Sequence, residues 1–440
     1  MASYSKGKGY SKDDLTESGT PVILYGRLYT KYESVIEEVD TFVDASNDGI
    51  YSHGDEVIVP ASGETAEDIA RASAVAQPGV LLGGDLNILR PNKSITSLFM
   101  ALSLSNGTAQ KELSKRAQGK SVVHVHNSDI QDVTISYPTI DEQTQIGAFF
   151  RSLDSLITLH QRKLDHLKEM KKGLLQKMFP KNGESIPELR FPGFADPWEQ
   201  RKFSEIATLR RGLTYSPNDI TDKNGGIRVL RSSNISGDQF ELHDDDVFVR
   251  EDAVKIAPAE DGDILITAAN GSSNLVGKRA RICNLPGKTV HGGFMLLAST
   301  GDSYYLNAAM GAQWYRRFLH MGVAGGNGAL GNLDMKALLD YELLTPSRNE
   351  RKKIGSLFNR LDSLITLHQR ERNIAISASQ VASHAQKLQL TRNNLFELSD
   401  LLLILVYELL HLGQVDFFLF FKSVDVTRNV QIVIVFLDLF

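Results

Sequence analysis

An internal duplication constrains this 440-residue chain more than any other feature of its sequence. Residues 146–162 read IGAFFRSLDSLITLHQR and residues 354–370 read IGSLFNRLDSLITLHQR, so that 13 of 17 positions are identical at an offset of 208 residues. Pro138 falls on Pro346 at the same offset. Because a long internal repeat implies two equivalent structural units, we predict a tandem duplication with pseudo-two-fold symmetry.

Each copy of the repeat begins with a globular segment and ends with one long helical segment. Residues 1–137 and 181–345 contain short runs such as TPVILYG and GDILITAAN, broken by Gly, Asn and Asp, which is typical of mixed α/β globules. Residues 138–180 and 346–398 each open with a proline, and the residues after it have the sequence pattern of a helix start. The predicted fold class is therefore α/β (α+β), with two mixed globules separated by two long helices. Residues 399–440 form an apolar tail that has no counterpart in the first copy.

The helical segments carry the spacing of a coiled-coil seam. In the first copy the core positions alternate by four and three residues from Ile146 to Met178. At 1.5 Å per residue, a helix over Asp141–Met178 would be about 57 Å long. We predict that the two helices pack antiparallel as a spacer, in preference to the alternative that each helix only caps its own globule. The residues predicted to pair are Ile146, Phe150, Leu153, Ile157 and Leu164 with Ile354, Phe358, Leu361 and Ile365.

Composition limits the functions that the chain can have. The net charge is −5, and residues 1–140 hold 12 Lys or Arg against 18 Asp or Glu, so any DNA contact must use local basic patches. The single cysteine, Cys283, excludes an internal disulfide and favours a cytoplasmic location. The most apolar stretch begins at Asp400, and Glu408 interrupts it before the ~20 apolar residues of a membrane span, so we expect no membrane contact.

Motifs of catalysis lack the context that their chemistry requires. The G-x-G-x-x-G pattern at residues 326–331 follows no convincing strand, so we interpret it as a loop with backbone donors or a plain turn. The E-x-K at Glu169 and Lys171 lies on a charged helix without a second acid. His124 and His126 have no third ligand nearby, which favours surface contacts over a metal site. We therefore expect no catalytic residue, metal or cofactor in this chain.

Polar and basic residues recur in corresponding loops of the two copies. Arg, Lys, Asn and Ser read base edges, and Lys, Arg, Ser and backbone N–H groups bind phosphates. Each residue alone is equally well explained as a solvated turn residue, but the duplicated placement favours DNA contact, with Asn270 and Arg279 the strongest candidates. The predicted DNA-binding residues are Lys6, Lys8, Tyr10, Ser11, Ser62, Thr65, Lys120 and Ser121 in the first copy, and Arg210, Arg211, Tyr215, Ser216, Asn270, Ser272, Ser273, Lys278, Arg279, Arg281 and Asn327 in the second.

The helical segments and their flanks resemble those of a known family. The stretch RSLDSLITLHQRKLDHLKEMKKGLLQKMFP, and LRFPGFADPWEQRKFSEIA before the second globule, are similar to recurrent segments of type I restriction–modification specificity subunits. The resemblance implies two target-recognition domains, each reading half of a bipartite double-stranded DNA site, and two helices that fix the gap. It also implies two docked methyltransferase subunits and restriction (translocase) subunits, with S-adenosylmethionine, ATP and Mg on those partners and no catalysis in this chain.

The resemblance covers roughly residues 5–370, and the chain departs from it in two places. The first copy lacks an equivalent of Phe191–Ala207, so its globule is expected to miss an opening strand. After Arg370 the residues Ile374, Val381, Leu388 and Leu395 are seven apart, which predicts a continued helix whose apolar face leaves the seam. Two other functions stay open: a coiled-coil scaffold that binds proteins, which suits the acidic first globule, and a nuclease with an unrecognised site.

Overall fold

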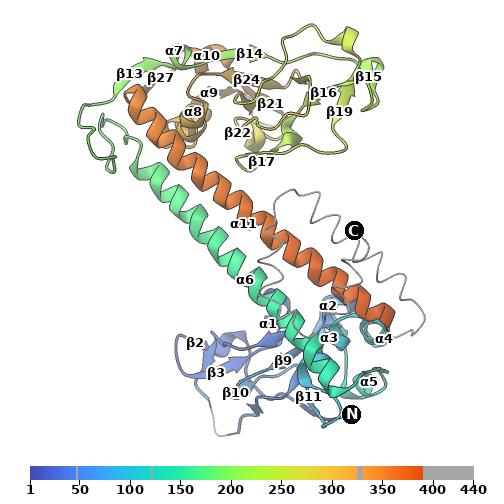
Figure 1. The fold of residues 1–440 in the computed structure, drawn as a ribbon. Helices are drawn as coiled ribbons and strands as arrows, with labels where there is room; N and C mark the ends of the chain where they lie inside the picture. The colour runs from blue at the N-terminus through green and yellow to red at the C-terminus, as the bar shows by residue number, and fades with distance from the viewer. Residues whose placement is uncertain (46–47, 120–121, 325–330, 390–440) are drawn as a thin grey trace. The chain divides into compact units, whose positions relative to one another are not determined.

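A computed structural model describes residues 1–45, 48–119, 122–324 and 331–389 of the chain. The chain divides into two compact units, one of Met1–Arg162 with Gln369–Phe440 and one of Lys163–His368. Each unit holds one globule and part of two long helices, α6 (Ile140–Lys177) and α11 (Arg348–Gln389) (Figure 1). In the described part of the chain, no helix has the length and apolar character needed to cross a membrane.

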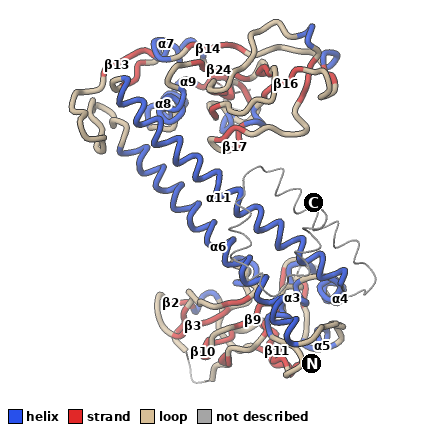
Figure 2. Tube along the Cα trace, in the orientation of Figure 1, coloured by secondary structure: helices blue, strands red, loops and turns tan. Residues whose placement is uncertain are grey.

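The first globule contains two five-stranded sheets, with short helices between the strands (Figure 2). The central sheet has the order β1 (Ala2–Lys6), β11 (Leu86–Pro91), β7 (Val57–Pro60), β9 (Ser73–Val75) and β4 (Val35–Ile36). The second sheet has the order β2 (Leu15–Thr16), β5 (Phe42–Val43), β3 (Thr20–Ile23), β10 (Pro78–Leu82) and β6 (Tyr51–His53). The other elements are α1 (Arg27–Thr30), α2 (Ala66–Ile69), α3 (Ser97–Ser105), α4 (Gly107–Arg116), α5 (Asn127–Gln131), the turn η1 (Lys12–Asp14) and the pair β8 (Ser62–Gly63) with β12 (Val123–His124).

The second globule repeats this plan with four-stranded sheets. The central sheet has the order β14 (Thr208–Arg211), β24 (Met295–Ser299), β20 (Ile264–Thr267) and β22 (Arg279–Arg281), and the second sheet has the order β15 (Ile220–Thr221), β19 (Val247–Val249), β16 (Ile227–Leu230) and β23 (Thr289–His291). Smaller sheets pair β13 (Glu199–Lys202) with β27 (Glu342–Thr345), β17 (Ile235–Ser236) with β18 (Gln239–Phe240), and β21 (Ala269–Asn270) with β26 (Gly331–Leu333) and β25 (Val323–Ala324). The helices and turns are α7 (Phe203–Ile206), α8 (Ser303–Ala309), α9 (Gln313–Gly322), α10 (Met335–Asp340), η2 (Pro217–Asp219), η3 (Ser232–Asn234), η4 (Glu251–Ala253) and η5 (Ser273–Leu275).

The central strands are buried on both faces, which explains their nearly continuous apolar sequences. In the first globule, Val57 and Val59 face a core cluster that includes α3 and α4. Ile58, between them, faces a second cluster that includes β3 and β10, as the alternation of side chains along a strand requires. Each central sheet is therefore a middle layer between helices and the second sheet.

The second globule contains a strand pair near its first central strand. In the second globule β13 pairs antiparallel with β27. Residues 134–137, which lie 208 positions before β27, form no strand in the first globule. Residues 134–137 thus differ from β27 in secondary structure, although they hold the corresponding place in the repeat.

Within each unit, α6 and α11 pack antiparallel. In the second unit Leu164 and Leu167 of α6 share a buried cluster with Leu361 and Ile365 of α11. Lys171 Nζ lies 2.7 Å from a carboxylate oxygen of Asp362, so higher numbers on one helix meet lower numbers on the other. In the first unit, Nδ1 of His160 lies 3.0 Å from a carboxylate oxygen of Glu371, which follows the same direction.

The predicted pairing residues are mostly buried, with two differences. Phe150, Leu153, Leu164, Ile354, Phe358, Leu361 and Ile365 are at most 6% exposed. Ile146 instead packs against the core of the first globule, and Ile157 is half-buried. Ile146 occupies a seam position in the first turns of α6, but the globule covers that end of the helix.

The helix continues beyond Arg370 to Gln389 as predicted, and Ile374 is out of phase with the seam. Ala375 is 6% exposed and lies two heptads after Leu361, so the seam continues in phase. Ile374, by contrast, is only half-buried. The alanines were overlooked because small side chains carry a weak apolar signal. The side chains of Val381, Leu388 and Leu395, and the tail 399–440, lie outside the described residues.

Candidate nucleic-acid interface

In each globule the chain leaving the first strand of the central sheet crosses a Gly-Gly turn. A Cβ added to Gly7 would lie 1.8 Å from the carbonyl oxygen of Gly83, and one added to Gly212 would lie 1.9 Å from that of Gly292. Only glycine fits such a close approach of two backbones. The same crossing is therefore built into both copies, although neither Gly-Gly pair had been singled out in the sequence. The signal was present, because Gly83-Gly84 and Gly292-Gly293 recur at nearly the repeat offset.

The crossing presents a basic residue at the end of each first strand. Lys6 ends β1 and Arg211 ends β14, and both side chains are exposed. Lys8 is also exposed and forms a loose ion pair with Asp48, with Nζ 3.7 Å from a carboxylate oxygen. Arg211 has no ion-pair partner among the described residues. These cations are therefore available to a phosphate.

The residues after the crossing stabilise the loop itself. Ser11 Oγ donates to a carboxylate oxygen of Asp14 at 2.9 Å, and Ser216 Oγ donates to Asp219 at 2.8 Å, so both serines cap 3-10 turns. Tyr10 and Tyr215 are half-buried against apolar clusters of their own globules. These four predicted DNA-binding residues hold the shape of the loops.

Two further loops lie beside the crossing in the second globule, one at Ser232 and one at residues 268–272. Ala268 N and Ala269 N donate to the carbonyl oxygen of Phe294 at 2.8 and 3.1 Å. Asn270 Nδ2 donates to Ser232 Oγ at 3.4 Å. The side chain of Phe294 is 67% exposed. We define the second loop surface as Arg211, Ser232, Asn270, Ser272 and Phe294.

Two of the notable residues at these loops were missed in the sequence. Phe294 follows two glycines and carries no polar group, so polar-loop reasoning passes over it. Arg231 directly precedes Ser232, and its Nε is buried with no hydrogen-bond partner among the described residues. Its place at the end of an apolar strand and before a Ser-Ser-Asn turn was the available signal.

The corresponding loops of the first globule differ in chemistry. The Gly-Gly turn is followed by Asp85, which accepts a hydrogen bond from Ser62 Oγ at 3.2 Å. Ser62 is only 7% exposed. Thr65 Oγ1 accepts from Asp68 N at 3.0 Å and so caps α2. The first loop surface therefore consists of Lys6 and Lys8.

Three arginines that the sequence predicts to bind DNA form hydrogen bonds or ion pairs within the second globule. Arg279 is 8% exposed, and its Nε and Nη2 donate to the carbonyl oxygen of Asn307 at 3.3 and 3.2 Å. Arg281 Nε donates to Ser303 Oγ at 3.0 Å, and Arg210 Nη2 pairs with Asp263 at 2.8 Å. Because its donors are used and its side chain is buried, Arg279 is corrected from a DNA contact to a packing residue. The alternation of side chains along β22 cannot show which face of that strand α8 covers.

Some of the other predicted DNA-binding residues lie outside the residues that the structure describes. Lys120, Ser121 and Asn327 lie outside the described residues, as does the side chain of Ser273. Lys278 is half-buried, and Ser272 is exposed with its N–H donating to Asn270 Oδ1 at 3.0 Å. His124 and His126 belong to no potential metal-ligand group in the described part of the chain.

A neutral histidine lies beneath the second Gly-Gly turn. His291 is 1% exposed, and its Nε2 lies 3.2 Å from the carbonyl oxygen of Arg210. Burial lowers the pKa of His291 from 6.5 to about 4, although the hydrogen bond to the backbone of Arg210 opposes the shift. The folded protein therefore keeps this imidazole uncharged at neutral pH.

His291→Gln should reduce the acid sensitivity of the protein. Because the folded pKa is lower than the unfolded one, stability that is present above pH 6.5 is lost as the pH falls toward 4. At about 1.4 kcal/mol per pKa unit, the loss is on the order of 2–3 kcal/mol. Urea unfolding of both proteins at pH 7 and pH 4.5 measures the difference, and equal losses in the two proteins would show that His291 does not titrate in this way.

Comparisons with known proteins agree with this arrangement. Residues 1–169 match the family model described as "Type I restriction modification DNA specificity domain". Over 346 residues the chain is 20% identical to the type I restriction enzyme MjaVIII specificity subunit of Methanocaldococcus jannaschii, covering 75% of this chain and 78% of that protein. Over 214 residues it is 24% identical to the type I restriction enzyme EcoKI specificity subunit of Escherichia coli K12, covering 48% of this chain and 45% of that protein.

A solved structure shows the same fold. The S subunit of a type I restriction–modification system from M. genitalium matches with a TM-score of 0.58 at 12% sequence identity, over 87% of this chain and 92% of that chain. The fold likeness and the match to the MjaVIII subunit each cover more of the chain than one copy of the duplication holds, and the family model matches the first copy. The chain is therefore similar in sequence to type I restriction–modification specificity subunits, and it shares the fold of one S subunit.

Proposed function

We propose that this chain is a specificity subunit that reads a bipartite double-stranded DNA site, one half with each globule. The observation that carries the proposal is the duplicated backbone crossing at Gly7 and Gly212, which presents a basic residue at the same place in both globules. Helices and close crossings are alike in the two copies, whereas the loop side chains around them differ. That is the pattern expected of two readers with one geometry and two different half-sites.

The second loop surface has the chemistry for both kinds of contact. Arg211 suits a phosphate or a guanine edge, and Asn270 suits an adenine edge, because their donors and acceptors match those groups. Exposed Phe294 suits apolar contact with a thymine methyl group. The first loop surface offers Lys6 and Lys8, which suit phosphates. We infer that the second loop surface reads the DNA sequence more than these two lysines do.

The proposal extends to the partners of the complex. The paired helices would set the spacing of the half-sites, and two methyltransferase subunits and restriction (translocase) subunits would be directed to the DNA by this chain. S-adenosylmethionine, ATP and Mg would then belong to those partners. Within the family, the specificity subunit aims catalysis and does not perform it.

Gel-shift competition tests the proposal against its alternatives. With a cognate methyltransferase present, the chain should select particular sequences out of a random DNA pool. A protein-binding scaffold would leave DNA unselected, and a nuclease would cleave DNA without any partner. Transfer of labelled methyl groups by the isolated chain would also contradict a non-catalytic role.

Two substitutions in the second loop surface should weaken binding in different ways. Asn270→Ala should relax one base position at a cost of about 1–3 kcal/mol, because a paired base contact is lost. Arg211→Ala, if Arg211 binds a phosphate, should weaken binding to all sequences alike and lower the salt slope by about 1. Binding isotherms of the complex at several salt concentrations distinguish the two effects.

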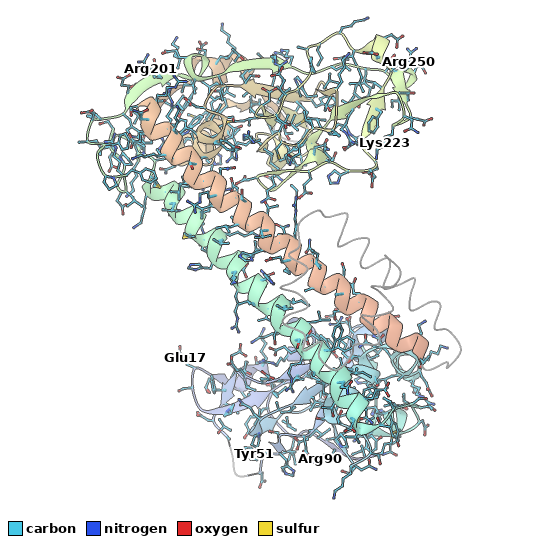
Figure 3. All side chains as sticks on the ribbon, viewed as in Figure 1. Glu17, Tyr51, Arg90, Arg201, Lys223 and Arg250 are labelled. Atoms are coloured by element: carbon cyan, nitrogen blue, oxygen red, sulfur yellow. The ribbon has the colours of Figure 1, made fainter. Side chains whose placement is uncertain are left out.

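Arg201→Ala is the matched control. Arg201 is exposed on β13 in the same globule (Figure 3), but it already pairs with Glu199 and Glu205 at 2.6 and 3.1 Å. The control should leave DNA affinity and selection unchanged. If all three variants behave alike, the second loop surface is not the DNA interface.

A further inference from the structure

The repeated helical segment carries one acid that is buried in part in each unit. Asp154 and Asp362 occupy the same place in the shared LDSLITLHQR sequence, 208 residues apart. In the second unit Asp362 pairs with Lys171, whose Nζ lies 2.7 Å from one carboxylate oxygen. The same Nζ lies 3.2 Å from Asp238, which pairs in turn with Arg279 at 3.3 Å. Each acid of this network therefore has a cation beside it.

The first unit lacks that cation. The residue 208 positions after Lys171 is Ser379, on the described part of α11. Asp154 accepts a hydrogen bond from Ser34 Oγ and has no ion-pair partner among the described residues. Burial raises the pKa of Asp154, and the nearby Glu33 raises it further. A short hydroxyl thus replaces a four-carbon ammonium side chain opposite an uncompensated carboxylate.

A cavity of about 340 Å³ lies where the lysine side chain is missing. Its lining includes both Asp154 and Ser379, with Ser34, Tyr32, Leu102 and Phe150. Phe150 and Leu102 supply apolar walls, and Asp154 supplies the charge. Arg71 also lines the cavity, but it is engaged by Asp68 at 3.2 Å and lies over the ring of Tyr32 at 5.9 Å.

We propose that this cavity binds a small primary alkylammonium ion, whose ammonium group pairs with Asp154 as Lys171 pairs with Asp362. The apolar walls would cover the alkyl stem, as the stem of a lysine is covered in a protein. One carboxylate is too few for a metal ion, which needs several oxygen ligands. An organic cation with an alkyl chain matches both halves of the lining. The proposal concerns the first unit alone and does not depend on DNA binding.

Thermal unfolding of the full chain with n-butylammonium chloride tests the site. The ligand should raise the Tm saturably by about 2–4 °C, because it binds only the folded state. n-Butanol and sodium chloride at the same concentrations should not, since the first lacks the charge and the second lacks the stem. No saturable shift with butylammonium would overturn the proposal.

Two variants separate this site from a general salt effect. Ser379→Lys supplies the ammonium covalently, so it should raise the Tm without ligand and abolish the response to butylammonium. Asp154→Asn should weaken the apparent affinity for butylammonium at least tenfold. The fold should be kept, because the amide is isosteric with the carboxylate but uncharged. If both variants respond to butylammonium as the original chain does, the ion binds elsewhere and the proposal is wrong.

Discussion

Leu361→Asp should destabilise the helix pair by more than the 2–5 kcal/mol that a buried leucine truncation costs. Leu361 is 5% exposed and belongs to a buried cluster with Leu164 of α6 and Phe358 of its own helix. The substitution removes apolar contacts and also places a carboxylate in a site without a partner, which adds a desolvation penalty. Calorimetry should show a loss of several degrees in Tm, and methyltransferase binding should fall with it.

Leu364→Asp is the matched control, because Leu364 lies one turn away on the same helix and is 43% exposed. The first unit offers a second pair, in which Leu153 is 2% exposed and Leu159 is 45% exposed. The aspartate at each exposed position should leave the Tm nearly unchanged. Equal losses at buried and exposed positions would contradict the antiparallel seam.

Exchange of the second globule should change one half of the recognised DNA sequence and leave the other half fixed. The exchange replaces residues 205–345 with the equivalent segment of another family member, and keeps α6, α11 and the first globule. The expected change is complete at that half-site, because each mismatched base pair costs about 1–3 kcal/mol and several positions change together. Methylation-site mapping in cells that express the chain with its partners measures both halves.

The reciprocal exchange of residues 1–137 is the control for this result. It should change the half-site that the first exchange left fixed. Spacing between the halves should stay constant in both cases, because the helices are unaltered. If either exchange changes both halves, or neither, the globules do not read DNA independently.

The sequence alone determined the duplication and the two helices. Identity at a fixed offset and heptad spacing are properties of the chain itself, so they survive without knowledge of tertiary contacts. The pairing of Leu164 with Leu361 could be predicted for that reason. The continued seam at Ala375 could not, because a small residue gives little apolar signal in either phase.

Tertiary structure decided which polar side chains are exposed to a ligand and which are bonded within the protein. Arg279 and Arg211 both lie on strands of the central sheet, but α8 covers Arg279 and leaves Arg211 exposed. The crossing of Gly7 over Gly83 joins segments 76 residues apart in the sequence, so the repeated Gly-Gly pairs mark the two turns but do not reveal which backbone each turn approaches. Likewise, the antiparallel register places Lys171 against Asp362 and puts Ser379 on the same cavity as Asp154. Side chains acquire these roles only through the neighbours that folding brings to them, and those neighbours are distant in sequence.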